Sequence, residues 1–272
     1  NNSQRAAASW LGKTAAFHPV TSFRTDPTMH PQLTWQRTPA TLLQSDATVR
    51  AAWDGLNDGH LALPFMASSV VASALTCFGS GREQLLSGFA AGALQAMIVV
   101  APQGRLRWAT FQPSQLPLGA WVANAGLSPD ALSLQLMRSS ALGRPLVISM
   151  TQVDTLQAAR QEDTPATRHD DYIPTSWIDV EGSFDDYWAA RGKNLRQNLR
   201  KQRNKLATDG VHTTLEFAAT AADIAPALVR YGRLESTGWK AGGGTAIDVD
   251  NVQGRFYQQV LQEAAERGEA WV

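Results

Sequence analysis

Three strand-like segments follow one another in the first half of the chain, and this succession constrains the fold more than any other feature. They are short apolar segments separated by turns, at 84–90, 93–100 and 106–111. The Pro-Gln-Gly sequence at 102–104 is typical of a hairpin turn between the last two. Helical patterns and a further strand surround them, at 47–56, 67–78, 128–142 and 145–150. This order of elements predicts a mixed α+β (α/β) fold.

Charge is balanced over the whole chain, with 24 Lys and Arg against 24 Asp and Glu among 272 residues. This balance argues against a strongly basic nucleic-acid-binding protein, and 44% hydrophobic residues argue against a disordered chain. The longest apolar run, 89–101, contains Gln95 and is shorter than the ~20 residues of a membrane helix. We therefore expect a cytoplasmic protein, either soluble or peripherally associated with the inner membrane.

The character of the sequence changes near Gly182. Residues 1–40 show no periodicity and predict an arm or linker. Residues 41–182 predict a first domain that ends with a strand at 172–180. The remaining residues, 183–272, predict helices and strands at 183–206, 211–218, 222–235, 255–267 and 269–272. Because the chain stops inside the last of these strands, we expect 183–272 to be the N-terminal part of a second domain.

A basic helix is predicted at the start of this second part. From Arg191 to Lys205 there are seven basic residues and no acidic one. A basic stripe lies beside an apolar stripe, with Lys193, Arg196, Arg200 and Arg203 on the first and Phe184, Trp188, Leu195, Leu199 and Leu206 on the second. A solvated face usually carries Glu-to-Lys pairs four residues apart, and none occurs here. Three interpretations remain open: a solvated face, a site for a phosphate-bearing or other anionic substrate, or a contact with nucleic acid or a membrane surface.

Glu235 is the candidate catalytic residue. On the helix predicted at 222–235 it falls within the apolar arc of Ile224, Leu228 and Tyr231, away from Arg230. Partial desolvation there would raise the pKa of the carboxyl group toward the range of a general base. The alternative is that Glu235 frays into solvent in the last helical turn or pairs with an arginine.

A glycine-rich loop at 237–247 follows this helix. Consecutive glycines, Gly243 among them, permit a close approach of the backbone to a ligand, and their amides can line an anion site. Trp239 and Lys240 beside them would offer an apolar wall and a charge. A flexible connector fits the composition equally well. The loop matches neither a Walker loop nor a dinucleotide-binding fingerprint.

Metal and thiol chemistry have little support in the sequence. Asp248 and Asp250 form an Asp-x-Asp that could hold a divalent metal, but this spacing is common in turns. The five histidines are far apart and show no ligand spacing. Cys77 is the only cysteine, which excludes an intrachain disulfide and favours a packed thiol. We therefore expect no metal site.

Several short motifs of the second half together resemble one family. They are Phe184-Asp-Asp-Tyr187, Asn194-Leu-Arg-Gln-Asn-Leu-Arg-Lys-Gln-Arg203, Leu206, Gly210, Leu234-Glu235, Gly238-Trp239-Lys240, Gly244-Thr-Ala-Ile247 and Phe256-Tyr257. With these residues, and with Pro64-Phe65 and the 111–119 stretch upstream, the chain resembles the CelD-type acetyltransferases. These are GNAT-like proteins of cellulose and exopolysaccharide production, related to the FemAB aminoacyl transferases. The resemblance covers about residues 45–272 and is strongest from 184 to 257.

The resemblance implies tandem GNAT-like acyltransferase domains, of the acyl-CoA N-acyltransferase fold, with the second one truncated. Acyl donor and acceptor would meet near the junction of the two domains. The GNAT pyrophosphate loop, Arg/Gln-x-x-Gly-x-Gly/Ala, does not occur in the chain, and we expect it beyond Val272.

The leading hypothesis is an acyltransferase that uses acetyl-CoA or another acyl-CoA as co-substrate. It would acylate an amino or hydroxyl group of a sugar or cell-envelope precursor directly, in association with a polysaccharide-synthesis complex. Glu235 would be the base, Trp239, Lys240 and Gly243 would bind the donor, and the substrate would contact Lys193, Arg196, Arg200, Arg203 and Tyr257. The alternatives are a transferase that uses aminoacyl-tRNA, with the basic stripe as the tRNA contact, and a noncatalytic GNAT-like scaffold.

Overall fold

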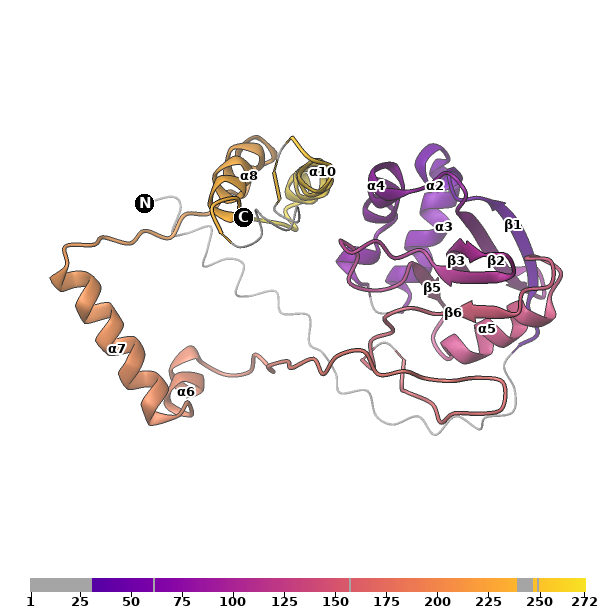
Figure 1. Cartoon of the computed structure of the whole chain (residues 1–272), viewed down its shortest axis with the longest axis horizontal. Helices are drawn as coiled ribbons and strands as arrows, with labels where there is room; N and C mark the ends of the chain where they lie inside the picture. The colour runs from indigo at the N-terminus through magenta and orange to yellow at the C-terminus, as the bar shows by residue number, and fades with distance from the viewer. Residues whose placement is uncertain (1–30, 61, 157, 239–246, 249) are drawn as a thin grey trace. The chain divides into compact units, whose positions relative to one another are not determined.

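Strands from the first half of the chain form one mixed sheet (Figure 1). The computed structural model describes residues 31–60, 62–156, 158–238, 247–248 and 250–272. The described strands are β1 (Thr34–Pro39), β2 (Gln84–Ala90), β3 (Ala93–Gly104), β4 (Arg107–Thr110), β5 (Trp121–Ala123) and β6 (Val147–Ser149). They lie in the order β1-β2-β3-β4-β6, and β5 also pairs with β3. The pairs are antiparallel except β4 with β6, which is parallel.

Both faces of the sheet are buried, because its central strands are apolar at successive positions. Leu85, Met97 and Val99 belong to one hydrophobic cluster, and their neighbours Leu86 and Ile98 belong to another on the opposite face. Side chains alternate between the faces of a strand, so an uninterrupted apolar run such as 96–100 serves both clusters. The mixed α/β fold expected from the sequence is confirmed.

Helices cover the two faces. One cluster includes residues of α2 (Leu42–Ser45), α3 (Ala47–Asp58) and α4 (Ser68–Phe78), and the other includes residues of α5 (Pro129–Arg138). Asp46 caps α3 by accepting a hydrogen bond from the Thr48 amide at 2.8 Å. Trp53 of α3 is fully buried, and its indole N–H donates to the carbonyl of Met66, in the 3₁₀ turn Pro64–Met66, at 2.7 Å. The hydrophobic clusters shared with the strands hold the helices against the sheet.

The second half of the chain is helical where it is regular. Its described helices are α6 (Phe184–Ala189), α7 (Lys193–Thr208), α8 (Ala221–Glu235) and α10 (Val252–Glu266). α10 packs against α4 through Phe256, whose ring centroid lies 5.3 Å from that of Phe78. α8 packs against α10 through a small cluster of Ile224, Leu228 and Ala265. None of the described helices is long and apolar enough to cross a membrane.

Several local predictions are wrong. Residues 34–39, expected within the arm, form β1 and pair with β2 along their whole length. Residues 172–180 form no strand, because no described segment pairs with their backbone. The helix expected at 183–206 is two helices, since the chain leaves helical geometry at Gly192, where ψ is 140°.

The two strands predicted in the second half, at 211–218 and 269–272, do not form as regular strands, but their ends meet. Residues 211–218 and 269–272 are not assigned as strands. Ala218 and Val272 nevertheless exchange both backbone hydrogen bonds, at 2.8 and 3.0 Å. This is the pairing pattern of an antiparallel bridge. The rings of Phe217 and Trp271 meet edge to face beside it, with centroids 5.1 Å apart.

Candidate active site

Glu235 ends α8 and is half-buried. Its Oε1 accepts a hydrogen bond from the Tyr231 hydroxyl at 3.0 Å, one helical turn earlier. Its Oε2 accepts from the backbone N–H of Ile247 at 2.6 Å. Both carboxylate oxygens are therefore engaged by donors from the chain itself. The side chain is therefore held in one orientation and does not fray into solvent.

The same contacts close the glycine-rich loop at its base. A Cβ atom added at Gly232 would lie 2.6 Å from the carbonyl oxygen of Ile247, so only glycine permits this close approach of the chain to α8. Glu235 and Gly232 together fix Ile247 beside the last turn of the helix. Trp239, Lys240 and Gly243, the predicted donor-binding residues, lie outside the described residues.

The apolar arc expected on α8 is confirmed for two of its three residues. Ile224 and Leu228 are buried against α10, whereas Tyr231 is 42% exposed. Arg230 lies on the solvent-exposed side of α8, as expected, and its Nη2 is 3.8 Å from Oε2 of Glu216. The Tyr231 hydroxyl thus reaches the carboxylate of Glu235 at the surface rather than in the core.

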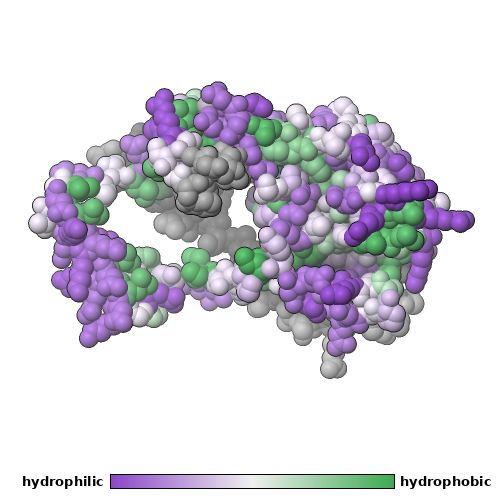
Figure 2. Space-filling model, in the orientation of Figure 1, coloured by the Kyte–Doolittle hydropathy of each residue, from purple (hydrophilic) through white to green (hydrophobic). Residues whose placement is uncertain are grey.

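The basic residues of α7 form a solvent-exposed face. Lys193, Arg196, Arg200 and Arg203 are all exposed, and α7 has no buried residue. The visible surface of α7 is mainly hydrophilic, with hydrophobic residues at intervals (Figure 2). Among the described ion pairs, none involves this helix. No described hydrogen bond or ion pair joins α7 to α8, so the structure does not bring these residues to Glu235.

Tyr257 lies in a packed environment. It is half-buried, contacts the clusters beneath α4 and α8, and meets Phe256 edge to face at a centroid distance of 5.3 Å. Its ring therefore contributes to the packing of α10. Binding of substrate by this residue stays a prediction.

Asp248 and Asp250 adopt the arrangement of a turn. Oδ1 of Asp248 accepts a hydrogen bond from the Asp250 amide at 3.0 Å, and the Asp250 carbonyl accepts from the Arg255 guanidinium at 3.0 Å. The structure groups no set of three metal-ligating side chains within the residues it describes.

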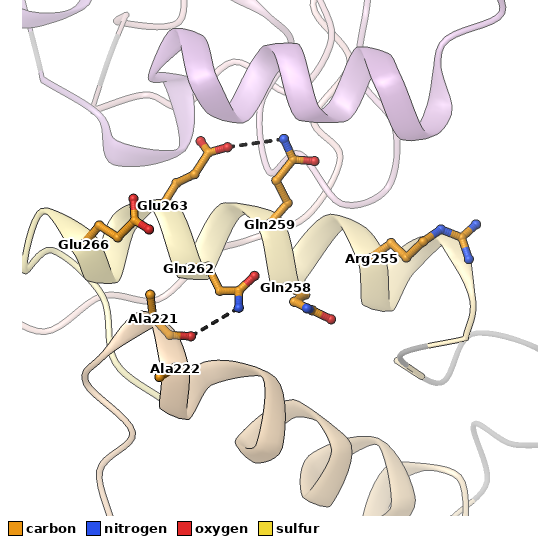
Figure 3. A pocket seen from close by; sticks show the side chains of 8 residues that line it. All are labelled: Ala221, Ala222, Arg255, Gln258, Gln259, Gln262, Glu263 and Glu266. Carbon is orange, nitrogen blue, oxygen red and sulfur yellow. Dashed lines mark hydrogen bonds between the residues drawn. The ribbon is translucent and has the colours of Figure 1, made fainter.

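The polar face of α10 lines an open groove (Figure 3). The groove has a volume of about 730 Å³ and lies beside the first residues of α8, Ala221 and Ala222. Gln and Glu recur along it at helical spacing, a pattern that does not by itself distinguish a groove from a solvated face. It lies at the opposite end of α8 from Glu235.

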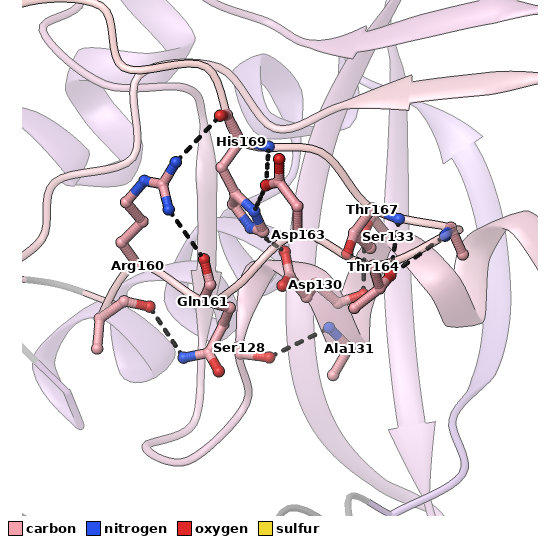
Figure 4. Close-up of polar contacts among 12 residues, drawn as sticks. Ser128, Asp130, Ala131, Ser133, Arg160, Gln161, Asp163, Thr164, Thr167 and His169 are labelled. Atoms are coloured by element: carbon pink, nitrogen blue, oxygen red, sulfur yellow. Dashed lines mark hydrogen bonds and ion pairs between the residues drawn. The ribbon is translucent and has the colours of Figure 1, made fainter.

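A second polar cluster surrounds His169 (Figure 4). Its Nδ1 lies 3.0 Å from Oδ1 of Asp163, and its Nε2 lies 3.0 Å from Oδ1 of Asp130 at the start of α5. The hydrogen bond with Asp163 is the main cause that raises the pKa of His169, and Asp130 adds to it. The same hydrogen bond lowers the pKa of Asp163.

No sequence pattern indicates this His169 cluster. Asp130 is 39 residues from His169 along the chain, so no local pattern joins them. The cluster fastens the segment at 163–169 to the N-terminal turn of α5. His169 pairs with an aspartate at each ring nitrogen, which makes the cluster a structural clamp.

Comparison with known families identifies the class of the second half. Residues 193–272, less than a third of the chain, match the family model of the acetyltransferase (GNAT) domain. The matched segment contains Glu235, the basic face of α7 and the glycine-rich loop. This domain supports an acyltransferase enzyme, and such domains generally use acyl-CoA as co-substrate. No curated protein and no solved structure gives a significant match to the chain.

Proposed function

We propose that the protein is an acyl-CoA-dependent N- or O-acyltransferase in which Glu235 acts as the general base. The observation that carries the proposal is the position of Glu235 within the matched acetyltransferase domain, with its carboxylate oriented at the base of the glycine-rich loop. In a direct transfer, the acceptor nitrogen or oxygen bonds to the acyl carbon, its proton passes to a base, and the CoA thiolate leaves.

The contacts of Glu235 suit this role. A carboxylate offers about four lone-pair sites, and the Tyr231 hydroxyl and the Ile247 amide occupy two of them. Because both donors hold the carboxylate in place, little reorientation is needed before proton transfer.

We assign the binding of anionic groups to the basic face of α7 and to the glycine-rich loop. Arginines at i, i+4 and i+7 can make forked contacts to phosphate oxygens. Arg196, Arg200 and Arg203 have this spacing, and they have no carboxylate partner among the described ion pairs. Lys193 extends the same face, and Trp239, Lys240, Gly243 and Tyr257 complete the proposed donor and substrate contacts.

The proposed acceptor is an amino or hydroxyl group of a sugar or cell-envelope precursor. Its support is the resemblance to CelD-type proteins, which also favours tandem GNAT-like domains at 41–182 and 183–272. We propose on the same ground an association with a polysaccharide-synthesis complex, peripheral to the inner membrane.

The uncompensated basic run of α7 supports a second donor, an aminoacyl-tRNA. When basic side chains neutralise several phosphates of a nucleic acid, the affinity of the protein for that nucleic acid falls steeply as the salt concentration rises. Strong binding of tRNA whose salt dependence weakens in Arg200→Ala would favour this donor. Acyl-CoA binding that survives in the same variant at equal salt would favour acyl-CoA.

A thermal-shift series tests the donor. The full-length protein, which extends through the expected pyrophosphate loop, is heated with acetyl-CoA, with longer acyl-CoAs and with CoA alone, each at a concentration well above the expected Kd. A ligand present at 100 times its Kd stabilises the folded state by about 2.7 kcal/mol. Stabilisation by acyl-CoA supports the proposal, and stabilisation by none of these ligands contradicts it and favours a scaffold.

Two substitutions distinguish a general base at Glu235 from a residue that only holds the glycine-rich loop in place. Glu235→Gln keeps an oxygen that can accept from Ile247 but cannot take a proton at neutral pH, whereas Glu235→Ala loses both functions. General-base catalysis contributes typically about 10²–10⁴-fold, so both variants should lose turnover by that factor. Full turnover across pH in Glu235→Gln together with loss in Glu235→Ala would show that the residue only positions the loop.

A further inference from the structure

The groove beside α10 is lined by a continuous polar helix face. Its lining positions on α10 are 255, 258, 259, 262, 263 and 266, which recur at the i, i+3, i+4 spacing of one face. The alternate face carries Phe256 and Ala265, which are buried. The two faces divide α10 between the core and the groove, so the polar side chains line the groove while the apolar ones pack inward.

The wall of the groove is fixed by two hydrogen bonds (Figure 3). The Gln262 amide donates to the carbonyl of Ala221 at 3.2 Å and so ties α10 to the first turn of α8. The Gln259 amide donates to Oε1 of Glu263 at 3.2 Å. Ala221 and Ala222 have small side chains, which leaves space between the two helices.

Other lining groups are available to a ligand. Gln258 is half-buried and Glu266 is exposed, and neither has a hydrogen-bond partner in the described part of the chain. A glutamine amide supplies two N–H donors and a carbonyl acceptor, whereas a carboxylate only accepts. Arg255 adds donors at one end of the face. The groove thus presents donors and acceptors side by side.

The lining chemistry selects one class of ligand. Two carboxylates against one guanidinium leave the groove negative, so it disfavours phosphates and other anions. None of the lining residues is aromatic, so a nucleobase has no stacking surface there. Hydroxyl groups both donate and accept, as the glutamine amides do. We propose that the groove binds a polyhydroxylated amine, the chemistry of an amino sugar, with its ammonium group at Glu263 and Glu266.

This site is separate from the proposed position of the acyl transfer. Ala221 and Glu235 are the first and last residues of α8, fourteen residues apart, which corresponds to about 21 Å along the helix. A single sugar ring in the groove cannot also place its amine at Glu235. The groove therefore holds a ligand, or a remote part of one, independently of the acyl donor.

An NMR titration without acyl-CoA tests the proposal. The side-chain amide resonances of Gln258, Gln259 and Gln262 report on the groove directly, and Gln→Ala variants assign them. Glucosamine supplies hydroxyls and an ammonium group, glucose lacks the charge, and ethanolamine lacks the ring of hydroxyls. We expect glucosamine to shift these resonances and to bind about five- to tenfold more tightly than either other probe, as for one charge-assisted hydrogen bond.

Matched variants identify the groups responsible. Glu266→Gln should weaken glucosamine binding about five- to tenfold and leave glucose binding unchanged, because it removes only the charge. Glu162→Gln is the control, since Glu162 is exposed and lies outside the groove. Equal binding of ethanolamine and glucosamine, no shift with any probe, or an equal effect of the two variants would overturn the proposal. These outcomes do not depend on turnover, so they are distinct from failure of the proposed acyl transfer.

Discussion

Apolar residues are buried in the sheet region at 32–150 but exposed in the segment at 172–217, although both were expected to form strands. In the sheet region, successive apolar residues of β2 and β3 are buried on both faces. Between residues 172 and 217, apolar side chains are exposed, with Ile173 at 67%, Val180 at 90% and Leu215 at 79%. A strand needs a partner for its backbone, whereas a helix satisfies its own hydrogen bonds. For this reason α6 and α7 form in the segment and the expected strands do not.

A comparison of two tryptophans, one buried and one exposed, should give the largest effect of the predictions made from this contrast. Trp53 is fully buried and its indole N–H is bonded to Met66, whereas Trp177 is 64% exposed. Trp53→Ala should destabilise the sheet region by about 4–5 kcal/mol, because it leaves a cavity and a carbonyl without its donor. Urea unfolding followed by circular dichroism measures the change.

Trp177→Ala is the matched control for that measurement. A surface substitution away from packed features usually changes stability within about 0.5 kcal/mol. If Trp177→Ala destabilised the chain as much as Trp53→Ala, the segment at 172–217 would be packed in solution, and the contrast between the two regions would be wrong.

The fold was predictable where periodicity and turn residues agree. The strands at 84–90 and 93–100 and the helix at 222–235 were found within a few residues of their bounds, since apolar spacing and flanking turns point to the same element. β1 is not predicted by its local sequence, because the strand that it pairs with, β2, lies some fifty residues away. Pairing at such a distance leaves no mark in the local sequence.

A phenylalanine pair tests how firmly the helical part is attached to the sheet region. Phe256 of α10 is buried against Phe78 of α4, while Phe184 of α6 is 70% exposed. Phe256→Ala should cost about 3 kcal/mol and should lower the amide protection of α10 more than that of β2 and β3. Phe184→Ala should leave both unchanged. Hydrogen exchange distinguishes these outcomes, and equal loss of protection in α10 and the sheet would show one cooperative unit.

The His169 clamp predicts a pH-dependent contact between 163–169 and α5. The pKa of His169 is raised in the folded state, so its contribution is full below its ordinary pKa of 6.5 and is lost as pH rises through the folded value. The pKa of Asp163 is lowered, so its contribution is present above 3.8 and is lost as pH falls through the folded value. The clamp should therefore be strongest at mildly acidic pH.

His169→Ala measures this contribution. Partly exposed ion pairs are worth about 1 kcal/mol or less, so the global stability should fall by no more than that. The amides of α5 should exchange faster in the variant at pH 6 and should differ little from the wild type at high pH. A pH-independent difference would show that His169 acts by packing alone.

The candidate site was predictable only in part, and the reason is again distance along the chain. Glu235 could be selected because its angular position on α8 follows from the sequence. Its partner Ile247 could not, since that contact depends on where the chain returns after the glycine-rich loop and on the close approach at Gly232. The groove at α10 had a local signal, a polar stripe at helical spacing, but a polar stripe alone is also what a solvated face shows.

The smallest predicted effect concerns α7, where stability and anion binding should change in opposite directions. In Arg200→Glu, the new carboxylate lies four residues from Arg196 and three from Arg203, and each such pair stabilises a helix by about 0.2–0.5 kcal/mol. Gln197→Glu creates similar pairs with Lys193, Arg200 and Lys201 while keeping every basic residue. Both variants should therefore slow amide exchange in α7 slightly. If the basic face binds the phosphates of a donor, only Arg200→Glu removes a contact, so CoA affinity should fall further in Arg200→Glu than in Gln197→Glu. Equal affinities in the two variants would mean that α7 acts only as a solvated helix, with a charge pattern that binding does not use.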